Sequence, residues 1–134
     1  GFATQPVAVA RGDGLRLVGA RITNAVKCLP PENKPTPAEV RTCNGFLAAD
    51  LRTVPEGGVI LALGRIAHDA VLRALALKAA AFPFAHGATH ALAGNRLLVD
   101  SYHCSRYNTN TGRLTEPMFR SVFDAIARHL RTAT

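Results

Sequence analysis

The sequence predicts an α/β fold, a three-layer α/β/α domain with a central, mainly parallel sheet. Short apolar runs at residues 57–64 and 95–102 have the composition of buried strands. A stretch with helical periodicity follows each of them, and strands that alternate with helices are typical of a parallel sheet covered by helices. The length of 134 residues fits one domain, so we expect residues 1–134 to form a single domain.

The N-terminal part is predicted to supply one strand and one helix. Residues 20–26, "ARITNAV", mix β-branched and apolar side chains as strands do. Residues 27–37 contain four prolines, which predict an ordered loop without regular structure. Residues 36–39, "TPAE", are a capping box with proline at the first helical position, so a helix is expected from there to about Thr53. One face of this helix carries its apolar residues, which are Val40, Cys43, Phe46, Leu47 and Leu51.

The C-terminal part is predicted to continue the alternation of strands and helices. Residues 57–64, "GGVILALG", are expected to form a central strand, and a helix should follow over 65–77. A loop and a short strand are expected within 82–92, and the next strand within 95–102. Thr115 is expected to cap the last helix. The buried stripe of that helix is predicted to contain Met118, Val122, Phe123, Ile126 and Leu130.

The charge of the chain favours polyanionic partners, and nucleic acid first among them. Lys and Arg number 16 against 9 Asp and Glu, which gives a net charge of +7. A generally basic surface is the alternative explanation. No apolar run approaches the ~20 residues that a membrane span needs, and we recognise no signal peptide. We therefore expect a soluble, cytoplasmic bacterial protein that works as a monomer away from membranes.

Polar segments follow the first and the last predicted strands. In parallel sheets, ligands bind outside the carboxyl ends of the strands, so Asn24 and His103 are candidate site residues. The amide of Asn24 can match the edge of a nucleobase, although a lone asparagine more often satisfies its own turn. The imidazole of His103 can donate a hydrogen bond to a developing anion, and a structural histidine bonded to the backbone explains its position equally well.

The three cysteines leave more than one interpretation open. Cys28 and Cys43 are separated by 14 residues, which is no standard zinc spacing. Each is either a small buried apolar residue or a ligand in a metal site. Cys104 lies next to His103, as in a nucleophilic dyad, but adjacent side chains usually point apart.

The sequence indicates no catalytic role for the other histidines. His86, in "FAHGATH", is expected in a loop near the site. His68, His90 and His129 are interpreted as ordinary helix or surface residues.

Two longer stretches resemble motifs of a known family. "ITNAVKCLPPENKPTPAEVRTC" resembles the middle motif of the iron–sulfur branch of the uracil-DNA glycosylase superfamily. "SYHCSRYNTNTGRLT" resembles the final motif of that superfamily, in the version that marks the type-5 subgroup. "VILALGRIAHDAVL" is similar to the strand and helix between them. The resemblance implies a DNA repair enzyme that hydrolyses the N-glycosidic bond of uracil, and of related deaminated bases, in DNA.

The resemblance also implies roles for individual residues. Asn24 matches the residue that reads the uracil edge, and His103 matches the one that stabilises negative charge on uracil O2. Cys28 and Cys43 match the last two ligands of a [4Fe–4S] cluster. The loop that enters the minor groove and holds the flipped base out of the stack matches Ser105, Arg106, Tyr107 and Asn108.

Two departures from the family pattern leave alternatives open. Cys104 replaces the usual proline of the final motif. The first motif, with its carboxylate and the first two cluster cysteines, is expected upstream of Gly1, so we interpret the chain as a fragment that is inactive alone. The alternatives are a non-catalytic relative that binds damaged DNA and a cysteine-dependent hydrolase that uses Cys104.

Overall fold

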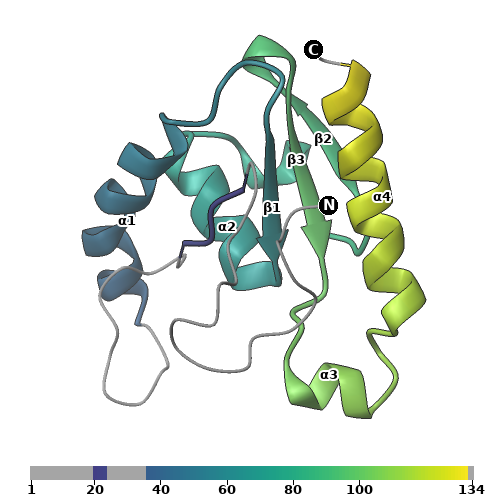
Figure 1. Cartoon of the computed structure of the whole chain (residues 1–134). Coiled ribbons are helices and arrows are strands. Elements are labelled where there is room, and N and C mark those ends of the chain that lie inside the picture. The colour runs from purple at the N-terminus through teal and green to yellow at the C-terminus, as the bar shows by residue number, and fades with distance from the viewer. Residues whose placement is uncertain (1–19, 24–35, 133–134) are drawn as a thin grey trace, which may run out of the picture.

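The computed structural model describes residues 20–23 and 36–132, without the side chains of residues 40–43, 106 and 107. The fold is a mixed α/β structure in which helices flank a three-stranded sheet (Figure 1). In chain order, the elements are α1 (Pro37–Leu51), β1 (Val59–Leu63), α2 (Arg65–Ala74), β2 (Thr89–Leu92), β3 (Arg96–Ser101), α3 (Arg106–Asn110) and α4 (Glu116–Thr132). None of these helices combines the length and the apolar character needed to cross a membrane.

The described sheet has the strand order β1-β3-β2 and contains both kinds of pairing. β1 and β3 are parallel, with Val59 opposite Leu97, as the two apolar runs predicted. β2 pairs with β3 in the antiparallel direction, with Thr89 opposite Val99. Only the short turn Ala93–Asn95 joins β2 to β3, and a parallel pair would need a much longer crossover.

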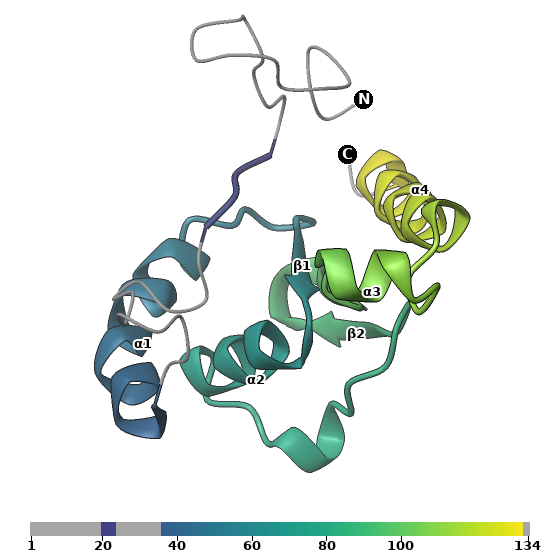
Figure 2. The same cartoon turned by 90° about the horizontal axis from the view of Figure 1, so that it is seen from below.

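The sheet buries apolar residues on both of its faces. Because side chains alternate along a strand, Ile60, Ala62 and Leu98 share one face, where they pack with residues of α1 and α2. On the opposite face, Val99 packs against Val122 and Ile126 of α4. Figures 1 and 2 show the same arrangement, with α1 and α2 on one side of the strands and α4 on the other.

Helix α1 begins as its capping box predicted, but its apolar face differs from the expectation. The Thr36 hydroxyl oxygen accepts a hydrogen bond from the Glu39 amide at 3.2 Å. Leu47 and Leu51 are buried, whereas Phe46 is 60% exposed, so the prediction that Phe46 is buried is wrong. Successive helical residues point about 100° apart, and packing Leu47 with Leu51 against the sheet turns Phe46 outward.

The strand predicted over residues 20–26 is wrong for the part that the structure describes. Residues 20–23 have no regular secondary structure, and Ile22 is 79% exposed. The side chains of Arg21 and Thr23 instead bond to Asp50 of α1, at 3.2 Å and 2.9 Å. These bonds attach the segment to a helix surface rather than to a strand. Residues 24–26 lie outside the described residues.

The carboxyl ends of β1 and β3 lie at the same end of the sheet, close to α3 (Figure 1). Gly64 follows β1, and its amide donates to the carbonyl of Ser101, the last residue of β3, at 2.8 Å. The polar segment 102–105 continues from Ser101 to α3. This edge is where parallel sheets bind ligands, so the fold places His103 where a site is expected.

Candidate active site at the carboxyl end of the sheet

His103 is exposed directly beyond β3, and the turn after β1 packs against it. A Cβ placed on Gly64 would lie 3.2 Å from the Cβ of His103, which is a very close contact. Gly64 also has a φ of +97°, a backbone conformation that favours glycine. Glycine at this position therefore permits the backbone of the β1–α2 turn to support the His103 loop.

On its other side, His103 is held by the start of α3. The Asn108 side-chain amide donates to the His103 carbonyl at 2.8 Å. The Asn108 main-chain amide in turn donates to the Ser105 hydroxyl oxygen at 3.3 Å, and the Thr109 amide donates to the Ser105 carbonyl at 3.0 Å. Ser105 and Asn108 therefore have structural bonds that fix the loop around His103.

An aromatic group lies beside this loop. The Tyr102 ring stacks on the His86 ring, with centroids 4.9 Å apart and an interplanar angle of 29°. The guanidinium carbon of Arg113 lies 5.4 Å from the centre of the Tyr102 ring, and that of Arg65 lies 5.4 Å from the centre of Phe84. Both arginines are exposed, so the aromatic rings hold two cationic groups near His103 in solvent.

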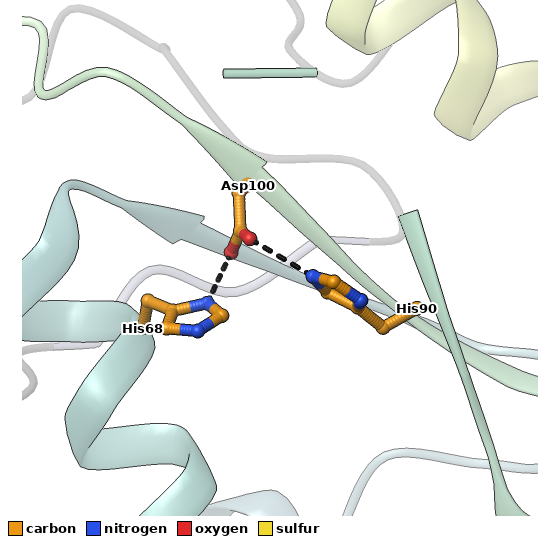
Figure 3. A group of neighbouring side chains, drawn as sticks. All are labelled: His68, His90 and Asp100. Atoms are coloured by element: carbon orange, nitrogen blue, oxygen red, sulfur yellow. Dashed lines mark hydrogen bonds and ion pairs between the residues drawn. The ribbon is translucent and has the colours of Figure 1, made fainter. Parts of the chain in front are cut away.

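Behind the loop, Asp100 of β3 is fully buried and bonds to two histidines (Figure 3). Its Oδ1 lies 2.7 Å from His68 Nδ1, and its Oδ2 lies 3.2 Å from His90 Nε2. The other ring nitrogen of His68, Nε2, lies 2.7 Å from the carbonyl oxygen of Phe82. This buried network of His68, Asp100 and His90 joins α2, β2, β3 and the segment before β2.

The hydrogen bonds determine how many protons the network holds. A carbonyl oxygen only accepts, so His68 Nε2 carries a proton toward Phe82. A second proton lies between His68 Nδ1 and Asp100, since two lone pairs would repel at that distance. The His68–Asp100 pair is therefore neutral overall. The three side chains also place one possible metal-ligand atom each within 4.8 Å of one another, and the two hydrogen bonds to Asp100 account for this proximity.

The network corrects the interpretation of His68 and His90 as ordinary helix or surface residues. His68 is only 1% exposed, and the side chain of His90 is 12% exposed. The sequence did contain a signal for His68, because it precedes Leu72 by four residues and so shares the buried face of α2. Asp100 was missed, although it directly follows the apolar residues of β3.

Comparison with known proteins shows the family of the chain. Residues 1–127 match the family model described as Uracil DNA glycosylase superfamily. The chain belongs to the uracil-DNA glycosylase superfamily. This finding confirms the resemblance that the two sequence motifs indicated.

Relatives within the superfamily are similar over most of this chain. The Type-5 uracil-DNA glycosylase of Thermus thermophilus is 49% identical over 91% of this chain and 55% of its own length. The protein of the same name from Pyrobaculum aerophilum is 44% identical over 86% of this chain and 49% of its own. The one from Mycobacterium bovis is 41% identical over 92% of this chain and 47% of its own. The chain thus spans about half the length of these curated relatives.

The structure places some of the residues that match superfamily motifs. His103, Ser105 and Asn108 lie together after β3, and His86 contacts the same loop, as expected from its position in the sequence. Cys104 in this loop is an exposed free thiol. Five of the predicted site residues are not described at the level of their side chains: Asn24 and Cys28 lie outside the described residues, Cys43 lies in α1, and Arg106 and Tyr107 begin α3.

Proposed function

We propose that the protein is a DNA repair glycosylase that hydrolyses the N-glycosidic bond of uracil, and of related deaminated bases, in DNA. The similarity to type-5 uracil-DNA glycosylases carries this proposal. The exposed position of His103 at the carboxyl end of the sheet supports it. The target base of a duplex is stacked inside the helix, so the enzyme would act after flipping it out.

His103 is proposed to stabilise the leaving base. Cleavage of the glycosidic bond leaves negative charge on uracil and positive charge on the sugar. An imidazole N–H directed at uracil O2 would bind that negative charge most strongly in the transition state. The contacts of Gly64 and Asn108 with His103 support this role, because a hydrogen-bond donor stabilises a transition state best when its position is fixed in advance.

Asn24 and the loop after β3 are proposed to bind the substrate. The Asn24 amide would pair with the edge of uracil, where its two kinds of hydrogen-bonding group match the base. The loop of Ser105, Arg106, Tyr107 and Asn108 would press into the minor groove. The exposed guanidinium groups of Arg65 and Arg113 support this proposal, since they provide phosphate-binding groups near His103.

Cys28 and Cys43 are proposed to hold a [4Fe–4S] cluster in part. Their thiolates are the ligand type that such clusters require, and they supply two of the usual four. Cys43 lies in α1, and Cys28 precedes that helix in the sequence. When bound, the cluster would be structural and would tie the segment around Cys28 to α1.

The cluster proposal is tested by the iron content of cysteine variants. Cys43→Ser and Cys28→Ser should each lose most of the bound iron from the full-length protein, because serine is a poor ligand for iron–sulfur clusters. Cys104→Ser is the matched control and should retain the iron. Iron quantification and the visible absorbance of the purified proteins measure both. Full iron content in Cys28→Ser and Cys43→Ser would contradict the proposal.

We propose the three-layer α/β/α fold with a mainly parallel sheet for the domain as a whole. Helices α1 and α2 against one face of the sheet and α4 against the other support the three layers. The parallel pair of β1 and β3 supports the strand direction, and β2 is an antiparallel addition beside β3.

The proposed activity is tested on duplex DNA with a single uracil. The full-length protein should produce abasic sites from this duplex and leave the matched thymine duplex intact. Asn24→Ala should slow single-turnover excision far more than it weakens DNA binding, because the base edge loses its partner. A lost match of this kind costs about 1–3 kcal/mol, which corresponds to roughly 5–150-fold in rate. An unchanged excision rate in Asn24→Ala would reject the role of Asn24.

The same assay separates the alternative functions. A non-catalytic relative would bind the uracil duplex without forming abasic sites. A cysteine-dependent hydrolase would lose activity after treatment with iodoacetamide while keeping its affinity for DNA. The exposure of Cys104 makes that second outcome measurable, because the reagent can reach the thiol.

A further inference from the structure

His86 lies where the hydrogen bonding between β2 and β3 extends beyond the strands. The Asp100 amide donates to the Ala88 carbonyl at 3.0 Å, and the Gly87 amide donates to the Asp100 carbonyl at 2.8 Å. The amide of Tyr102, two residues after Asp100 and just beyond the end of β3, has an imidazole nitrogen as its partner. Tyr102 N–H donates to His86 Nδ1 at 3.1 Å. A side chain thus takes the place of a backbone carbonyl at the end of the ladder.

This bond fixes the protonation state of His86. Because the amide of Tyr102 donates, Nδ1 must be unprotonated, and the ring proton lies on Nε2. A doubly protonated imidazole has no acceptor and could not form the bond. The stacking of the His86 and Tyr102 rings holds the imidazole plane against the same residue.

The segment that carries His86 is anchored on both sides. On one side, the Phe82 carbonyl accepts from His68 Nε2 of the buried network at 2.7 Å. On the other side, Gly87 and Ala88 bond to the backbone of Asp100, whose side chain belongs to the same network. The position of His86 therefore depends on a fully bonded, buried group rather than on solvent.

Three separate segments then hold the backbone at His103 in place. His86 holds the amide of Tyr102, Asn108 holds the carbonyl of His103, and Gly64 lies against the Cβ of His103. The bond from His86 lies at the beginning of the two-residue stretch 102–103, and the bond from Asn108 lies at its end. Loss of either one would free one end of this stretch to rotate.

We propose that His86, as the neutral Nε2–H form, is a positioning residue that directs His103 toward the leaving base. This inference rests on the proposed glycosylase function of His103. In this role, His86 does not contact the reacting atoms of the substrate. It acts through the Tyr102 amide, so its removal lowers the rate of excision and leaves the affinity for DNA intact.

Two variants of the full-length protein separate the acceptor of His86 from its ring. His86→Phe keeps an aromatic ring for stacking but removes the acceptor, and we expect single-turnover excision to fall roughly 10–100-fold, the range expected for a small misplacement of a catalytic group. His86→Asn returns an acceptor oxygen near the position of Nδ1 and should recover most of the rate. Affinity for uracil-containing DNA should stay unchanged in both. His129→Phe is the matched control, since His129 bonds to the Asn95 carbonyl instead, and it should behave as the wild type.

NMR of the histidine nitrogens gives a readout that does not depend on activity. His86 Nδ1 should appear unprotonated and hydrogen-bonded to the Tyr102 amide. A protonated Nδ1, or a wild-type rate in His86→Phe, overturns the inference. The inference is also overturned if His86→Asn does not recover the rate and the loss of rate accompanies a loss of DNA affinity or a lower melting temperature. That result indicates a purely structural role for His86. If the wild-type protein excises no uracil, the proposed function itself is rejected. If the wild type and His86→Phe are both fully active, only the role of His86 is rejected.

Discussion

Replacement of His103 by alanine in the full-length protein is expected to slow single-turnover excision of uracil by about 100–1000-fold. On the proposed mechanism the loss is large, because the hydrogen bond from His103 to the developing anion on uracil O2 would be strongest in the transition state. Binding of uracil-containing DNA should barely change, since the ground-state base carries no such charge. Rapid-quench measurement of abasic sites under enzyme excess gives the rate, and fluorescence anisotropy gives the affinity.

Cys104→Ser is the matched variant for this experiment, because Cys104 is the exposed neighbour of His103 in the same loop. On the proposed mechanism its thiol has no chemical role, so the serine variant should stay close to the wild-type rate. The opposite pattern, with Cys104→Ser inactive and His103→Ala active, would exclude the glycosylase mechanism proposed for His103 and favour the cysteine-dependent alternative.

Replacement of Asp100 by alanine is expected to lower the free energy of unfolding by about 3–5 kcal/mol. The carboxylate is fully buried and bonds to both His68 and His90, so alanine leaves the buried imidazole of His68 and the partly buried one of His90 without their acceptor. Urea denaturation followed by circular dichroism measures the change. Asp69→Ala is the control, because Asp69 is exposed on α2 beside His68, and it should change stability by no more than about 0.5 kcal/mol.

Asp100→Asn tests the proton count of the same network. If the His68–Asp100 pair is neutral, an asparagine amide can donate to His68 Nδ1 while its oxygen accepts from His90, and every hydrogen bond is kept. The asparagine variant should therefore be much more stable than the alanine variant. Equal destabilisation by both would show that the pair carries a net charge that asparagine cannot replace.

Features governed by local chemistry were predictable from the sequence. The capping box at Thr36 and the apolar runs of β1 and β3 depend on neighbouring residues, and the structure has all three where the sequence indicated them. The direction of β2 was not predicted, because it depends on which strand the short segment meets in space. The same holds for residues 20–23, where the side chains of Arg21 and Thr23 bond to Asp50, far along the chain.

The candidate site was predictable to a similar extent. The position of His103 followed from the rule that polar segments after parallel strands lie at one edge of the sheet. The partners of His68 did not, because Asp100 and Phe82 become its neighbours only when α2 packs on the sheet. A histidine among apolar residues of a helix indicates burial, but the sequence does not say which acceptor it meets.

The contact between Gly64 and His103 also limits how this protein can evolve. Any residue larger than glycine at position 64 would combine an unfavourable backbone conformation with a Cβ 3.2 Å from that of His103. Such a substitution becomes tolerable only after the loop that follows β3 has moved away from Gly64, and that movement would displace the imidazole of His103. Variation in the β1–α2 turn is therefore tied to variation in a loop far away in the sequence, and the two segments are free to diverge only together.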